Sequence, residues 1–228
     1  MMKYLYIILP LCFAFNGFTR AQKTVQLFNG SNLTGWYAFE PESGVHQDAT
    51  ELFKVEDGMI RMYGAKAGYL MSDQSFHDFT LTAEFRWNTD TAFTRKNNKL
   101  NSGLMYLVPE TTPDTLWPKG IQFQIKEGAT GDFILLQDVT LINKGSRTEP
   151  GRSVVVKRLT DAANPIGDWN TLTVTYRNGT IKQELNGTLV NEGTEPSVTE
   201  GRILLQYEGF PIDFRKVDLT VDQDQTVK

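Results

Sequence analysis

The chain has very little cysteine and histidine. Its single cysteine, Cys12, lies in the apolar N-terminal stretch, and its two histidines, His46 and His77, do not stand at a spacing typical of metal ligands. A mature domain without Cys12 can form no disulfide. The sequence therefore predicts a fold held together by packing, and the histidines alone do not indicate a metal centre.

Basic residues are also fewer than acidic ones. The chain has 23 lysines and arginines against 27 aspartates and glutamates, which gives a formal net charge of −4. Loss of an N-terminal leader that holds Lys3 and Arg20 would make this about −6. Nucleic acids and anionic membrane surfaces are bound through basic patches, so the charge balance argues against both as partners. Neutral ligands remain open.

Long apolar runs are absent except near the N-terminus. Residues 1–21 combine a basic start at Lys3, an apolar run to Phe15 and small residues before Ala21, a pattern typical of a secretory signal peptide. The run is too short to cross a bilayer. We expect cleavage after Ala21 and a protein that is secreted, periplasmic or attached to the cell surface, without membrane insertion. Lipidation at Cys12 is disfavoured because bulky Leu11 precedes it.

Segments of helical length with a 3.6-residue apolar period are also lacking. Short strand-like segments alternate instead with the turn dipeptides Asn29-Gly30, Asp57-Gly58, Asn178-Gly179 and Asn186-Gly187. No linker composition divides residues 22–228. We therefore predict one all-β domain over this range, folded as a two-sheet antiparallel β-sandwich.

Four of these segments share long polar side chains on the face that is not apolar. They are residues 81–87 (LTAEFRW), 102–108 (SGLMYLV), 121–128 (IQFQIKEG) and 203–209 (ILLQYEG). Because successive strand residues point to opposite faces, we expect Glu84, Gln122, Gln124 and Glu208 to converge on one concave sheet face. The alternative is that each is an ordinary half-exposed strand.

That face would suit a carbohydrate ligand, since each amide both donates and accepts hydrogen bonds. Long segments at 88–101, 109–119 and 137–168 could form its walls. Trp117 and Phe93 could stack on sugar rings, or else plug the edge of the sandwich. The residues that we expect to bind substrate are Asn101, Tyr106, Trp117, Gln122, Gln124 and Gln206.

An ordered set of motifs also resembles a known family. The motifs are LFNGSNLTGW (27–36), FKVEDGMI (53–60), EFRW (84–87), NSG (101–103), IQFQIKEGATGDF (121–133) and GRILLQYEGFPIDFRKVDL (201–219). In this order they resemble the 3-keto-disaccharide hydrolase-like domain family over essentially the whole mature chain. The resemblance implies a concanavalin A-like jelly roll that acts on glycosides oxidised to a ketone at C3.

The match to the family pattern has two exceptions. Gln122 stands where many members have Glu, and Glu208 stands where many have His. The change at position 122 removes a candidate base or metal ligand. The residues that match the usual pattern are Glu84, Asn101, Ser102, Gly103, Gln124, Asp132 and Arg215.

The carboxylates limit the chemistry that the chain can perform. Ordinary glycosidases need two carboxyl groups at a defined separation, and the Glu-x-Asp-x-x-Glu spacing of jelly-roll glucanases is absent. A C3 ketone acidifies the C2 proton, so one base and one positive group or metal suffice for elimination. Glu84 or Glu208 could be the base, and Arg86 or Lys126 the electrostatic partner.

Other arrangements of the same residues compete with this one. A divalent metal could be held by Glu84, Glu208 and Asp132, although a salt bridge from Glu84 to Arg86 or Lys126 is an equal alternative. The sequence shows no phosphate loop, nucleophile elbow or Ser-His-Asp arrangement. The prediction is a secreted hydrolase or lyase of 3-keto glycosides; the alternatives are a non-catalytic carbohydrate-binding module and a structural sandwich.

Overall fold

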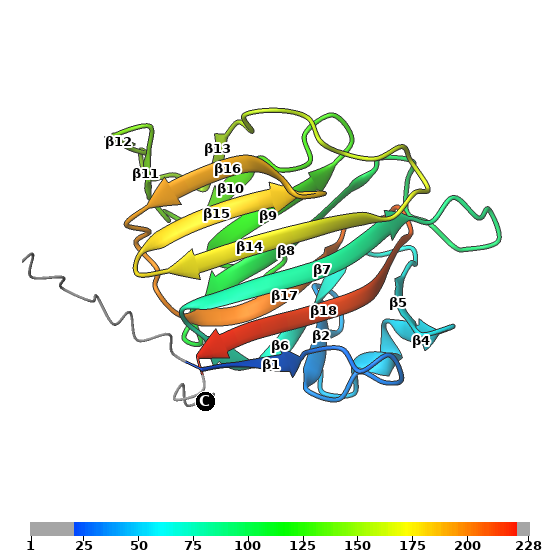
Figure 1. The fold of residues 1–228 in the computed structure, drawn as a ribbon. Coiled ribbons are helices and arrows are strands. Elements are labelled where there is room, and N and C mark those ends of the chain that lie inside the picture. Colours follow the sequence, from blue (N-terminus) through cyan, green and yellow to red (C-terminus); the bar gives the residue numbers. More distant parts are fainter. Residues whose placement is uncertain (1–20, 223–228) are drawn as a thin grey trace, which may run out of the picture.

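The computed structural model describes residues 21–222, which form two antiparallel sheets packed face to face (Figure 1). The predicted leader at residues 1–21 lies almost wholly outside this range. One single-turn 3-10 helix, η1 (Ala49–Glu51), accompanies the strands. The predicted all-β sandwich is therefore confirmed.

The strand order defines the two layers. The ten-stranded sheet runs in the order β12 (Ser146–Arg147), β11 (Ile142–Asn143), β16 (Thr188–Thr194), β15 (Thr180–Leu185), β14 (Asn170–Arg177), β7 (Phe79–Trp87), β18 (Ile212–Asp222), β5 (Met59–Met62) and β4 (Lys54–Glu56), with β1 (Gln22–Gln26) also paired to β18. The eight-stranded sheet runs in the order β13 (Ser153–Val156), β10 (Phe133–Leu136), β9 (Gly120–Lys126), β8 (Asn101–Val108), β17 (Gly201–Tyr207), β6 (Gly68–Phe76), β2 (Trp36–Glu40) and β3 (Gly44–His46).

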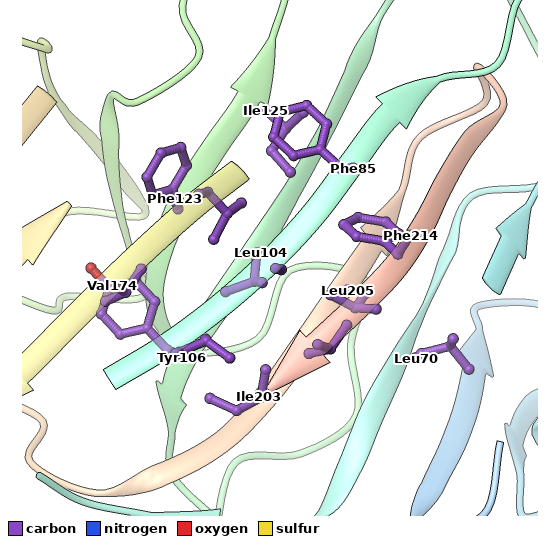
Figure 2. Packing of buried hydrophobic residues seen from close by; sticks show 14 of the residues in the cluster. Leu70, Phe85, Leu104, Tyr106, Phe123, Ile125, Val174, Ile203, Leu205 and Phe214 are labelled. Carbon is purple, nitrogen blue, oxygen red and sulfur yellow. The ribbon is translucent and has the colours of Figure 1, made fainter. Parts of the chain in front are cut away.

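The main core lies between the sheets. Strand β7 alternates strictly: every second side chain from Phe79 to Trp87, including Phe85, is buried, and the side chains between them are partly exposed. Figure 2 shows Phe85 and Phe214 packed close to Ile125 and Leu205 of the opposite sheet. Burial of large apolar side chains of this kind contributes roughly 1.5–3 kcal/mol each, so the inward parity of every strand is strongly determined.

The turn dipeptides act largely as predicted. Asp57, Asn178 and Asn186 have positive φ, and each is followed by a positive-φ glycine in a tight hairpin. Asn29-Gly30 differs because it connects β1 and β2, which belong to different sheets. There the Asn29 side chain accepts hydrogen bonds from the backbone of Ser31 and Asn32.

A second apolar cluster covers part of the outer face of the eight-stranded sheet. It includes Tyr37, Tyr69 and Leu204 and is packed against Trp117 of the 109–119 segment. The hydroxyls of Tyr37 and Tyr69 donate to Asp114 at 2.7 and 2.6 Å. Burial, with Asp114 beside them, raises the pKa of both phenols well above the usual value. The segment is thereby fixed over one half of the face, which leaves the other half open.

The segment 137–168 is partly ordered into strands. It holds β11, β12 and β13, and β13 pairs with β10 to extend the eight-stranded sheet. This extension supplies one wall of the open half of the face. Among the described residues, no helix is long and apolar enough to cross a membrane.

Candidate active site

A pocket with a volume of about 250 Å³ occupies the open half of the outer face of the eight-stranded sheet. This is just below the roughly 300 Å³ at which small-molecule sites usually begin. Strands β8, β9, β10, β13 and β17 and the 109–119 segment supply its lining. The lining residues are Asn101, Trp117, Gln122, Gln124, Ile134, Leu136, Gln137, Arg152, Ser153, Val155, Gln206 and Glu208.

Gly103 makes room for the amides of this pocket. It lies in the middle of β8, paired with Gln124 on one side and Gln206 on the other. A Cβ atom at this position would overlap the Gln122 side chain. The glycine of the NSG motif therefore allows the close approach of Gln122 across the strand, and its backbone φ is not in the left-handed region.

The polar side chains form one directed chain of hydrogen bonds that ends on Glu208. Gln122 donates to Gln124, Gln124 donates to Asn101 at 3.4 Å, and Asn101 donates to one carboxylate oxygen of Glu208. Gln206 donates to the other oxygen. Because an ionised carboxylate only accepts, Glu208 determines which way each amide in the chain faces.

Glu208 has the electrostatics of a general base. Burial raises the pKa of the Glu208 carboxyl above its usual value of 4.5, against the lowering effects of Asn101, Lys126, Gln206 and Lys96. Burial wins because it removes water from the charged form. A carboxylate with a raised pKa accepts a proton more readily at neutral pH.

Gln206 carries an acceptor without a partner. Its side chain is buried, and its Oε1 atom has no hydrogen bond to any described residue. An unpaired buried amide oxygen costs about 1–3 kcal/mol. The Oε1 atom is itself covered by protein, so Gln206 takes part in the pocket through the amide group that donates to Glu208.

The structure brings together most of the residues predicted to form the site. Asn101, Trp117, Gln122, Gln124, Gln206 and Glu208 all line the pocket. Lys126 has the same strand parity as Gln122 and Gln124 at the exposed end of β9, close enough for its charge to act on Glu208.

Glu84 and Arg86 do not join them, so the prediction that Glu84 converges with Gln122, Gln124 and Glu208 is wrong. Both residues lie on β7, in the middle of the other sheet and on its outer face. Glu84 accepts from Arg215 at 2.5 Å. Arg86 pairs with buried Asp213 at 3.1 Å, and its guanidinium lies 4.8 Å from the Trp169 ring centre.

Tyr106 also has a different place from the one predicted. On β8 the outer face, which lies toward the pocket, carries Asn101, Gly103 and Met105. Tyr106 therefore points the other way, into the core. It is fully buried, and its hydroxyl donates to Gln183 at 3.0 Å. Tyr106 is a core residue, and the prediction that it binds substrate is wrong.

The three carboxylates considered as metal ligands, Glu84, Glu208 and Asp132, do not converge. Asp132 is buried and accepts from Lys157 Nζ and from the Arg158 backbone N, both at 2.9 Å. It therefore anchors the chain that follows β13, far from Glu84 in the other sheet. Within residues 21–222, no group of three or more acidic, histidine or cysteine side chains could hold a metal. Glu84, Glu208 and Asp132 therefore do not form a shared metal site in the described part of the chain.

One arrangement that sequence reasoning had ruled out is present in outline. Ser43 Oγ lies 2.6 Å from His46 Nε2, and His46 Nδ1 lies 2.7 Å from Glu51. The Ser43 hydroxyl, however, donates its single proton to Glu40 at 2.6 Å. Activation of a serine requires that proton to be directed at the histidine, so these residues connect the β2–β3 hairpin to η1.

Sequence reasoning missed the wall formed by β10 and β13. Ile134 and Leu136 face outward into the pocket, beside Val155 and Arg152. Strand β10 reads FILL, which is apolar on both faces, so no alternation marks its outward residues. Arg152 lies in a segment that sequence reasoning treated as a long loop.

Comparison with known proteins places the fold among carbohydrate-active domains. A family model described as the 3-keto-alpha-glucoside-1,2-lyase-like domain matches residues 23–220. A candidate glycosyl hydrolase from Parabacteroides distasonis has 22% identity and a TM-score of 0.61, covering 88% of this chain and 94% of that chain. No curated protein matches the chain.

Two more distant structures share the fold alone. A beta-glucanase from Bacillus licheniformis has 14% identity and a TM-score of 0.53, covering 88% of this chain and 98% of that chain. The carbohydrate binding module CBM66 from Bacillus subtilis has 14% identity and a TM-score of 0.50, covering 81% and 95%. The same sandwich thus serves both catalysis and binding.

Proposed function

The chain belongs to the 3-keto-alpha-glucoside-1,2-lyase-like domain family, and we propose that it is a secreted enzyme that cleaves 3-keto glycosides with Glu208 as the base. At the coarser level, it is a jelly-roll domain of the glycosyl hydrolase-like or carbohydrate-binding kind. The observation that carries the proposal is the single carboxylate of the pocket, which has a raised pKa and is held by two amides.

One carboxylate in the pocket lining favours elimination over ordinary glycoside hydrolysis. Retaining and inverting glycosidases require two carboxyl groups on either side of the scissile bond. Glu208 is the one acidic residue that lines this pocket among the described residues. A C3 ketone removes the need for the second group, because it makes the C2 proton acidic enough for one base to take.

The proposed reaction proceeds in two steps at the sugar ring. Glu208 takes the C2 proton, and the electron pair of the C2–H bond forms an enolate with the C3 oxygen. As the ketone re-forms, a C1=C2 double bond forms and the bond between C1 and the glycosidic oxygen breaks. The electron pair of that bond goes to the glycosidic oxygen, which leaves with the aglycone. Glu208 returns the proton to that oxygen. Addition of water across C1=C2 would complete a hydrolysis.

The surrounding residues have separate roles in this scheme. Lys126 supplies positive charge near Glu208, which favours both the ionised base and the negative enolate. Gln122 and Gln124 offer hydrogen bonds to ring hydroxyls, and Gln206 holds the second carboxylate oxygen of Glu208. Asn101 holds the Glu208 carboxylate in place.

The proposal is tested by incubating purified protein with a 3-keto glucoside beside its unoxidised parent, with and without chelator. We expect cleavage of the keto sugar alone, because only the ketone acidifies C2. Comparable cleavage of the parent would contradict the proposal. The chelator arm reports separately on metal dependence.

The second candidate function is carbohydrate binding without catalysis. It is favoured by the lining itself, in which amides outnumber carboxylates and Gln122 replaces the glutamate common in the family. Under this alternative, keto and parent glycosides would both bind and neither would be cleaved. Calorimetric titration of both ligands, combined with product analysis, separates the two functions.

A further inference from the structure

The pocket has two chemically different halves. Asn101, Gln124, Gln206 and Glu208 form a polar half along β8, β9 and β17. The other half is mainly apolar, with Trp117, Ile134, Leu136 and Val155 in its lining and Ser153 and Gln137 as its polar neighbours. Val155 is 47% exposed, so this apolar surface is open to a ligand. A sugar ring matches the first half, whereas the second matches an apolar group.

Arg152 lines the apolar half, and its side chain has no partner in the part of the chain that the structure describes. Every other arginine in the described part of the chain has a hydrogen-bond, ion-pair or aromatic partner. The Arg152 guanidinium has none among residues 21–222, although it lines the pocket. Its backbone is held in place, because Gln137 N donates to Arg152 O at 3.1 Å. The Gln137 side chain in turn donates to Trp117 O at 3.2 Å.

Arg152 and Glu208 lie at opposite ends of the pocket. Strands β8, β9 and β10 separate β17 from β13, which places the axes of β17 and β13 roughly 19 Å apart at about 4.8 Å per strand. Along the strands, Arg152 lies beyond the Leu136–Ser153 pair and Glu208 beyond the Ser102–Tyr207 pair, at the other end. The two side chains would therefore contact different parts of one ligand.

Building on the proposed function, we infer that the leaving group is a planar aromatic ring that bears a carboxylate, so that the substrates are 3-keto glycosides of aromatic acids. The guanidinium presents parallel N–H donors that match a carboxylate. Trp117, Ile134 and Val155 offer an apolar surface to the ring that lies between the sugar and the acid. Because the protein as a whole is acidic, the positive charge of Arg152 at the pocket is not part of a generally basic surface.

An acidic sugar is the competing occupant for the Arg152 end. Most of its ring hydroxyls would lie against Ile134, Leu136 and Val155, whose side chains form no hydrogen bonds, and Ser153 could meet only one of them. Burying unpaired hydroxyls is unfavourable. The aromatic acid meets both the apolar surface and the arginine without leaving polar groups unpaired.

The test is a binding measurement that needs no turnover. The unoxidised ligands 4-carboxyphenyl glucoside and phenyl glucoside, each as both anomers, and a glucuronide-capped disaccharide are titrated by calorimetry into wild type, Arg152→Gln and Arg152→Lys. Arg147→Gln is the matched control, since Arg147 is an exposed arginine paired with Glu195 outside the pocket. Thermal unfolding checks that each variant is folded.

We expect wild type to bind the carboxyphenyl ligand roughly 10- to 100-fold more tightly than the phenyl ligand, as for a charge-assisted hydrogen-bond pair. Arg152→Gln should abolish that preference and leave phenyl binding unchanged. Arg152→Lys should retain part of it, and Arg147→Gln all of it. Equal binding of the two phenyl ligands by wild type would overturn the inference, as would an Arg152 effect confined to the disaccharide.

The two proposals can fail separately. If Glu208→Gln left keto-glycoside turnover intact, the assignment of the base would fail while the binding preference would stand. If the preference were missing but turnover depended on Glu208, only the inference on the leaving group would fail.

Discussion

Replacement of Gly103 by alanine tests how tightly the amides of the pocket are packed. The residue lies in a strand with an ordinary backbone φ, so alanine alone would be expected to stabilise it by roughly 0.5–1 kcal/mol. The added methyl group, however, would overlap the Gln122 side chain. Overpacking of this kind typically costs about 1–3 kcal/mol. The collision would also displace the amide that donates to Gln124.

We therefore expect Gly103→Ala to lower the free energy of unfolding by roughly 1–2 kcal/mol, the overpacking cost less the gain in the strand. Urea unfolding monitored by tryptophan fluorescence measures this change. The matched control is the double variant Gly103→Ala/Gln122→Ala, in which the methyl group has room. When Gly103→Ala is made in the Gln122→Ala background, it should cost little or no stability. Such a dependence of one change on the other is the coupling expected of residues in contact.

Two outcomes would refute this reasoning. Gly103→Ala could be as stable as wild type, which would mean that Gln122 does not lie over β8. Alternatively, the double variant could be destabilised by the sum of the two single changes, which would mean that the two positions do not interact.

Four further outcomes follow from the same geometry. Activity of the wild type should fall as pH drops through the raised pKa of Glu208, above its usual 4.5, because only the ionised form accepts the C2 proton; the pH profile of kcat/KM measures this. The folded protein holds the Glu208 proton to higher pH than the unfolded chain does. The contribution of Glu208 to the free energy of unfolding should therefore decrease as pH rises above 4.5. Urea unfolding of wild type and Glu208→Gln at several pH values measures this decrease. Gln122→Glu should move the acid limb of the kcat/KM profile to higher pH, because a second carboxylate in the pocket raises the Glu208 pKa by like-charge repulsion. An unchanged profile would place position 122 outside the reacting centre. Tyr106→Phe should lower stability by about 1–3 kcal/mol, because Gln183 loses a buried donor, with ligand affinity unchanged; a loss of affinity without a loss of stability would restore Tyr106 to the pocket.

Alternation along single strands was enough to predict much of the pocket. Gln122 and Gln124 are separated by Phe123, whose burial between the sheets forces both amides outward. The same argument applies to Gln206 and Glu208 around Tyr207. Parity within a strand is local information, and the energy of core burial enforces it.

Parity could not reveal which sheet a strand joins or what covers its outer face. Glu84 points away from the core as predicted, but β7 pairs with β14 and β18 in the other sheet. Those pairings depend on contacts between residues far apart in sequence. Tyr106 was misplaced for a related reason. The 109–119 segment covers part of β8, so Met105 on the outer face is as apolar as Tyr106 on the inner face.

The most direct test of the account compares wild type with Glu208→Gln on a 3-keto glucoside, with rate and affinity measured on the same preparations. The amide keeps the size of the side chain and removes its basicity. We predict that kcat falls by about two to four orders of magnitude, as for loss of a general base, while affinity for the substrate changes little. Near-wild-type turnover by Glu208→Gln would contradict the account and direct the search for the base to a residue other than Glu208.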